Sequence, residues 1–189
     1  PSFVLNFFSD FTGYLLNPFG TERVGLTVAE NQQPYVTNWI STLSKPLFWM
    51  FFFGTIFLFY ETINKTDKKY RSVLFSSFIL FLFGFIFSNY SSDSILNGQN
   101  LISKIVYFLS LLILIFGFLF VYIKDVKNNP QTKKIREIDF SYIFLISLII
   151  IMIIASRGAV RLFVVSSPVF IIPAAFLVIR LFFYRIESK

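Results

Sequence analysis

The chain has 189 residues, of which 56% are hydrophobic and 21% aromatic, whereas only 14% are charged. This composition is too apolar for an ordinary soluble domain, and the core of a small water-soluble protein could not bury all 28 phenylalanines. Cysteine and histidine are both absent, which excludes disulfides, thiolate nucleophiles, cysteine-ligated zinc and histidine bases.

The net charge of +7 does not indicate binding to nucleic acid, because the basic residues lie in short loops between apolar runs. A nucleic-acid surface would gather them on one soluble face, among aromatic side chains that stack on bases. Any chemistry in this chain must therefore use carboxylates, arginine or lysine.

Residues 1–45 are expected to form an external segment. Apolar side chains recur at helical spacing over residues 3–15, which predicts a helix in the membrane interface or the end of a preceding span. Asparagine, proline and glycine over residues 17–20 then end this helix. An extended, ordered loop is expected over residues 20–39.

Residues 46–189 contain five apolar runs long enough to cross a membrane as helices. Helices are expected because backbone amides find no water in hydrocarbon, and because the runs lack the strict alternation of barrel strands. The predicted spans are 46–62, 72–90, 102–123, 140–155 and 160–184. The fold class is therefore an all-α membrane protein, a multi-span helical bundle.

Positive charge is distributed unevenly between the loops, which predicts the orientation of the chain. The loops after the first and third spans and the carboxy-terminal tail hold most lysines and arginines, so the positive-inside rule places them in the cytoplasm. The external segment with Glu30 and the loop after the second span then lie on the extracytoplasmic side. A multi-pass protein of the cell membrane is expected.

Glu30 is the best candidate ligand among the acidic residues. It lies between an apolar stretch, residues 26–29, and an amide-rich stretch, residues 31–33. A carboxylate near a membrane surface can bind a hard cation or accept hydrogen bonds from an amide. A solvated loop glutamate is the plainer interpretation, and it stays open.

Arg157 and Arg161 are the second candidate group. They directly follow an apolar run and are four residues apart, a spacing that corresponds to one face of a helix. Arginine at membrane depth is costly and is normally offset by an anion, water or a functional partner, and its forked donors match phosphate oxygens. Snorkelling of both side chains to the interface is equally consistent with their position.

The catalytic subunit of archaeal oligosaccharyltransferase, a dolichyl-phospho-oligosaccharide–protein glycosyltransferase, resembles this chain in two segments, RVGLTVAENQQP and SRGAVRLFVVSSPV. Residues 27–30 match the TIxE-type motif of that family's large external loop, and residues 158–168 match a stretch with a VRL core. The resemblance implies a GT-C fold. It also implies transfer of a glycan from a dolichyl phosphate or pyrophosphate carrier to asparagine in Asn-X-Ser/Thr, the reaction of protein N-glycosylation.

The resemblance implies roles for individual residues. Glu30 would arrange the acceptor amide at or near a divalent metal, Mn or Mg, and Arg161 would bind the phosphate of the lipid-linked oligosaccharide. Arg157 lies outside the VRL core and is assigned as a supporting phosphate or interface residue. The expected partners are the lipid-linked oligosaccharide, an acceptor polypeptide and membrane lipid, without nucleic acid.

The family pattern is incomplete in this chain. Its amino-terminal aspartate motifs and its carboxy-terminal WWDYG-type motif are missing, so this segment is expected to be a central membrane portion that is inactive alone. Two spans are expected between the glutamate and the arginine in bacterial and eukaryotic relatives, whereas four are predicted here. The alternatives are a transporter or channel subunit for an anionic substrate and a purely structural membrane subunit.

Overall fold

The computed structural model describes residues 32–64, 66–128 and 140–187. Glu30 and the helix expected over residues 3–15 lie outside these ranges. The described residues form six helices: α3 (Val36–Leu43), α4 (Lys45–Ile63), α5 (Lys68–Phe87), α6 (Leu101–Asn128), α7 (Phe140–Gly158) and α8 (Val160–Glu187).

Five of these helices, α4 to α8, are long and apolar enough to cross a membrane. The predicted fold class is therefore confirmed: the protein is an all-α, multi-pass membrane protein. The helices differ from the predicted spans mainly at their ends, since α5 begins at Lys68 rather than residue 72, and α6 continues to Asn128 rather than residue 123. Lysine and arginine favour helix, so the helices extend beyond their apolar runs.

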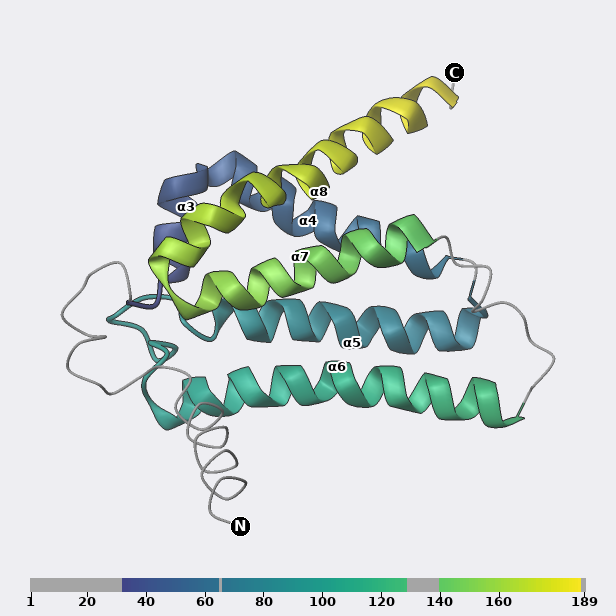
Figure 1. Ribbon diagram of the computed structural model, residues 1–189, viewed down its shortest axis with the longest axis horizontal. Coiled ribbons are helices and arrows are strands. Elements are labelled where there is room, and N and C mark those ends of the chain that lie inside the picture. The colour runs from purple at the N-terminus through teal and green to yellow at the C-terminus, as the bar shows by residue number, and fades with distance from the viewer. Residues whose placement is uncertain (1–31, 65, 129–139, 188–189) are drawn as a thin grey trace, which may run out of the picture.

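The long helices alternate in direction, which gives the bundle two ends. At one end α4, α6 and α8 begin and α5 and α7 finish, together with α3 (Figure 1). We call this the Val160 end, after the first residue of α8. The opposite end, where α5 begins, is called the Lys68 end.

Small residues allow α5 and α6 to pack closely as antiparallel neighbours (Figure 1). A Cβ added to Gly84 of α5 would lie 2.7 Å from the Cβ of Ser110 in α6, and one added to Gly117 of α6 would lie 2.7 Å from the Cβ of Ser77 in α5. Glycine thus faces serine at two levels of the contact. At one level the glycine belongs to α5 and the serine to α6, and at the other level the glycine belongs to α6 and the serine to α5. Such small pairs favour close helix contact within lipid.

Gly54 allows a similar approach between α4 and α8, because an added Cβ would overlap the carbonyl group of Pro173. α8 continues through both Pro168 and Pro173. Proline lacks the amide that would donate to the carbonyl four residues earlier, which for Pro168 is that of Val164. Ser167 Oγ donates to this carbonyl instead, at 2.8 Å.

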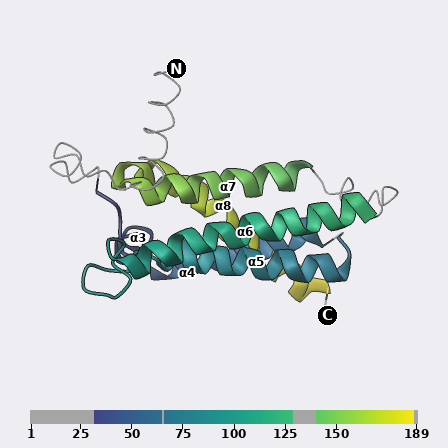
Figure 2. The same ribbon diagram turned by 90° about the horizontal axis from the view of Figure 1, so that it is seen from below.

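The core of the bundle is largely aromatic. The rings of Phe59 in α4 and Phe78 in α5 stack with centroids 3.9 Å apart, and those of Phe51 in α4 and Phe170 in α8 are 4.5 Å apart. α6 is more peripheral and lies in front of α5 and α4 in Figure 2. Only 17% of the most apolar 18-residue stretch of α6 is buried within the protein. Most of the apolar surface of α6 is therefore left uncovered by the other described helices.

α3 is a helix where the sequence predicted an extended loop, so that prediction is wrong for residues 36–39. Trp39 is 1% exposed, and its ring stacks on Phe163 and Phe170 of α8 with centroid distances of 4.9 and 5.7 Å. The β-branched and aromatic residues of this stretch favour extended chain locally. Burial of the indole against α8 favours the helix more strongly.

Candidate functional site

The segment that follows Glu30 is held against the start of α8. The amide of Val160 donates a hydrogen bond to the carbonyl of Gln32, with a distance of 2.9 Å. The first amides of a helix have no partner within the helix, so an external carbonyl can satisfy this one. The segment carrying Gln32 and the helix carrying Arg161 therefore meet at the Val160 end.

The connection between α5 and α6 supports the same segment from another direction. The amides of Val36 and Thr37 donate to the carbonyls of Asn89 and Tyr90 at 2.9 and 3.3 Å. Asn89 is 2% exposed, and its Nδ2 donates to the carbonyl of Pro34 at 3.1 Å. These bonds join residues 34–37 to the end of α5.

Gly98 shapes the turn that accommodates Asn89. Its φ of 79° lies in the left-handed region that favours glycine. A Cβ at this position would also overlap the side-chain amide of Asn89. Both the backbone conformation and the available space therefore require glycine here.

Arg157 is buried at the end of α7, with 3% of its surface exposed. Its Nη2 donates to Ser88 Oγ at 3.0 Å, and its Nη1 donates to Gln33 Oε1 at 3.5 Å. The guanidinium carbon lies 5.9 Å from the ring centroid of Tyr107 in α6. A buried guanidinium requires such partners because an isolated charge in an apolar medium is costly. Arg157 therefore does not snorkel to the surface. It links residues 32–35, which we call the loop segment, to α5 and α7.

Three buried donors at this end have no acceptor among the described residues: Gln33 Nε2, Trp39 Nε1 and Arg157 Nε. A buried donor that lacks a partner costs about 1–3 kcal/mol. Acceptors from outside the described part of the chain are therefore expected to approach this cluster.

Arg161 lies in the first turn of α8 and is exposed. Arg157 belongs to α7, which ends at Gly158, so the prediction that both arginines share one helical face is wrong. The break at Ala159 separates the two helices and gives the two arginines opposite environments. An exposed guanidinium can offer forked donors to a phosphate group, whereas Nη1 and Nη2 of Arg157 already donate to protein side chains.

No group of three or more histidine, cysteine, aspartate and glutamate side chains occurs within the described ranges. These residues alone do not form a metal site of Mn or Mg type, which takes several oxygen ligands. Glu30 lies outside these ranges, so its expected role at or near a divalent metal stays a prediction.

Arg157, Ser88, Asn89 and Gln33 make up the polar cluster at the Val160 end. The sequence analysis identified Arg157 but not the other three residues. One signal could have indicated Ser88 and Asn89. These residues directly follow the apolar run of α5, and Arg157 occupies the same position after the apolar run of α7. Polar residues at the same depth on neighbouring helices tend to pair in a membrane.

The fold and the cluster define a class, a multi-pass helical membrane protein with a buried polar cluster beneath an ordered loop segment. No protein-family model, curated protein or solved structure matches this chain.

Proposed function

We propose that this chain is the central membrane portion of an oligosaccharyltransferase catalytic subunit with a GT-C fold. The enzyme would move a glycan from a dolichyl phosphate or pyrophosphate carrier to asparagine in Asn-X-Ser/Thr acceptors. The hydrogen bond between Val160 and Gln32 is the observation that supports this proposal most strongly. Gln32 is two residues from Glu30, a chain length of at most about 7 Å, and Val160 immediately precedes Arg161.

The reaction requires two kinds of help from the protein. An amide nitrogen is a poor nucleophile, so it must be positioned and polarised while the departing phosphate is stabilised. Glu30 would accept a hydrogen bond from the acceptor amide, and Arg161 would donate to the phosphate oxygens. A divalent metal, Mn or Mg, held with Glu30 as one ligand, would supply Lewis-acid charge beside the amide.

The surface of α8 beyond Arg161 suits the carrier lipid. Leu162, Val164 and Val165 are 41%, 56% and 72% exposed, and they follow Arg161 directly along the helix. A polyprenyl chain could pack on this apolar surface while its phosphate stays at the helix start. Binding of such a carrier would explain why the exposed cation Arg161 lies next to exposed apolar side chains of α8.

Arg157 has a different role in this proposal from the phosphate contact that the sequence allowed. Its donors bind Gln33 and Ser88, so it would act as a positioning residue that holds the segment after Glu30 in place. A transporter or channel for an anionic substrate would instead need its arginines along a path between helices. The burial of Arg157 against protein partners therefore favours the transferase.

Glu30→Gln in the full-length protein tests the proposal. Transfer of glycan to an Asn-X-Thr peptide should fall about 100-fold or more, because the amide loses the group that positions it, while expression stays normal. Glu22→Gln provides the control, since it removes the same charge from the same external segment outside the motif. Unchanged turnover in the Glu30 variant would reject the proposed role.

Arg161→Ala tests the phosphate contact. The KM for the lipid-linked donor should rise more than the KM for the acceptor peptide, because only the donor carries the phosphate. A larger effect on the peptide would show that Arg161 does not bind the carrier.

A further inference from the structure

A second site lies near the Lys68 end, where side chains of α4 and α8 enclose a cavity of about 330 Å³. Most of its lining is aromatic or aliphatic, and Glu61 and Arg180 are its charged members. The Val160 end, with the loop segment and Arg161, is at the other end of both helices. The cavity is therefore separate from the proposed transfer site.

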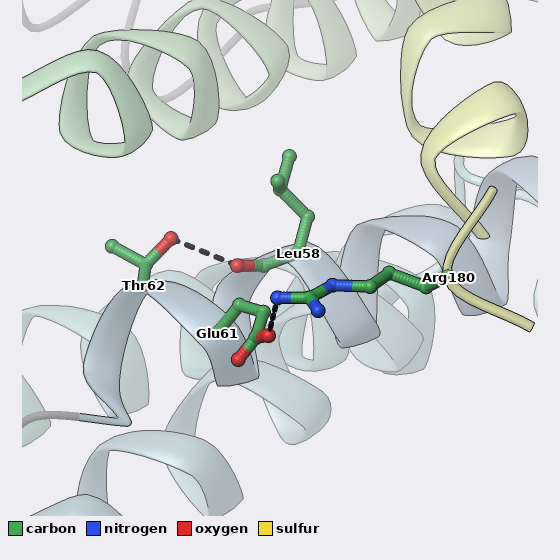
Figure 3. Close-up of polar contacts among 4 residues, drawn as sticks. All are labelled: Leu58, Glu61, Thr62 and Arg180. Carbon is green, nitrogen blue, oxygen red and sulfur yellow. Dashed lines mark hydrogen bonds and ion pairs between the residues drawn. The ribbon is translucent and has the colours of Figure 1, made fainter. Parts of the chain in front are cut away.

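Glu61 and Arg180 form an ion pair at this cavity, with Arg180 Nη2 donating to Glu61 Oε1 (Figure 3). The side chains are 22% and 47% exposed, respectively, so both remain accessible. A guanidinium group carries five donors, and this contact uses one nitrogen. Arg180 can therefore bind a further anionic group while it is paired with Glu61.

Arg71 places a second positive charge beside the cavity. Its guanidinium carbon lies 5.8 Å from the ring centroid of Tyr60, which lines the cavity. Arg71 Nη1 also donates to Asn64 Oδ1 at 2.7 Å, which holds the side chain near the end of α4. One guanidinium group thus lines the cavity and another lies beside it, whereas Glu61 is the one carboxylate among the lining residues, and this positive charge favours an anion.

The apolar part of the cavity is open at the surface of the bundle. Phe57, Leu181 and Phe183 line it and are 48%, 58% and 57% exposed. Arg180 is the first charged residue of α8 after Arg161, and it lies in the last third of the helix, so it lies close to the membrane boundary. The cavity therefore combines positive charge at the boundary with an apolar wall reaching into the membrane. An amphiphile with an anionic head and a hydrocarbon chain matches both features.

We propose that this cavity binds a membrane phospholipid from the leaflet at the Lys68 end. Arg180 donates hydrogen bonds to the phosphate, Arg71 adds positive charge, and an acyl chain packs against Phe57, Leu181 and Phe183. Glu61 limits the affinity because it competes with the phosphate for the guanidinium of Arg180. The site does not depend on the proposed transfer reaction.

Phosphatidylglycerol titrated into the purified full-length protein in detergent tests this site, with bound lipid counted by native mass spectrometry. Arg180→Gln should weaken binding about tenfold, because it removes charge-assisted hydrogen bonds to the phosphate. Glu61→Gln should strengthen binding, because the competing carboxylate is gone. An ion pair with a structural role alone would not give these opposite effects. Lys124→Gln is the control, since it removes an exposed positive charge near the same end, outside the cavity lining.

Leu181→Trp provides a test that leaves the ion pair intact. Leu181 is exposed, so the larger side chain should fill the cavity and displace lipid without disturbing the core. Inorganic phosphate should compete only weakly with phosphatidylglycerol, because it lacks the chain that fills the apolar wall. Equal lipid binding by the wild-type, Arg180 and Leu181 proteins would overturn the proposal. Full displacement by inorganic phosphate, or an equal loss of binding in the Lys124 variant, would also overturn it.

Discussion

Ser88, at the end of α5, accepts a hydrogen bond of 3.0 Å from Arg157, which lies 69 residues further along the chain in α7. Ser88 is fully buried and also donates to the carbonyl of Phe85 at 3.0 Å, so its hydroxyl serves both partners. Because Arg157 bonds to Gln33 as well, one side chain joins two membrane helices to the loop segment. The position of that segment therefore depends on the packing of the bundle beneath it.

Replacement of Arg157 by methionine should loosen the loop segment. The change keeps an apolar stem but leaves Ser88 and Gln33 without their donor, at a cost of about 1–3 kcal/mol. The amides of Val36 and Thr37 should then exchange with deuterium about tenfold faster or more, measured by mass spectrometry. Arg161→Met is the control and should leave this exchange unchanged, because Arg161 is exposed. Equal exchange in the two variants would contradict the positioning role.

Alanine at position 54 should destabilise the contact between α4 and α8. The new methyl group of Gly54→Ala would meet the backbone carbonyl of Pro173, which cannot rotate away as a side chain can. Overpacking of this kind costs about 1–3 kcal/mol, which a denaturant titration in detergent can measure. Gly158→Ala is the matched control, because its nearest contact is Leu162 Cδ1 at an ordinary 3.8 Å. Equal stability of the two variants would show that Gly54 does not limit the helix approach.

The facing glycine and serine residues of α5 and α6 should behave as coupled pairs. Gly117→Ser alone should destabilise the protein, because serine would face Ser77 across the close contact. Adding Ser77→Gly should recover about 0.5–3 kcal/mol of unfolding free energy, since the exchange restores one small residue at that level. Adding Ser110→Gly to Gly117→Ser changes the contact with Gly84 instead, so it should not restore the unfolding free energy. A rescue of equal size by both second changes would argue against specific pairing.

Cysteine pairs can test the docking of the loop segment, because the natural chain contains no cysteine. Gln32→Cys combined with Val160→Cys should be cross-linked readily by a short bifunctional thiol reagent, since the two backbones share a 2.9 Å hydrogen bond. Protease digestion followed by gel electrophoresis would show the joined fragments. Gln32→Cys combined with Lys68→Cys, which lies at the opposite end, should remain unlinked. Similar cross-linking of both pairs would exclude the docked arrangement.

The membrane helices could be predicted from sequence because each depends on a local property, the length of an apolar run. α3 could not be predicted in the same way, since it is short and its helical form depends on the burial of Trp39 against α8. The partners in that contact are far apart in the chain, and local preferences for extended structure concealed it.

The two arginines show the same limit at the candidate site. Their spacing suggested one helical face, but the break at Ala159 places Arg157 in α7 and Arg161 in α8. Which of them is buried depends on Ser88 and Gln33, and no local pattern relates these residues. The pair of Glu61 and Arg180 is similar, since its members are 119 residues apart.

The close packing of α5 on α6 has a consequence for the number of membrane crossings. The two helices form a hairpin that leaves from the Lys68 end, where α4 finishes, and returns to that end, where α7 begins. Since α4 also contacts α7 directly, excision of the hairpin would reconnect the chain without inverting any remaining helix. Two crossings, α4 and α7, would then lie between Gln32 and Arg161 in place of four. Insertion or removal of a helical pair keeps Arg161 on the same face of the membrane, whereas insertion or removal of a single helix would move Arg161 to the opposite face.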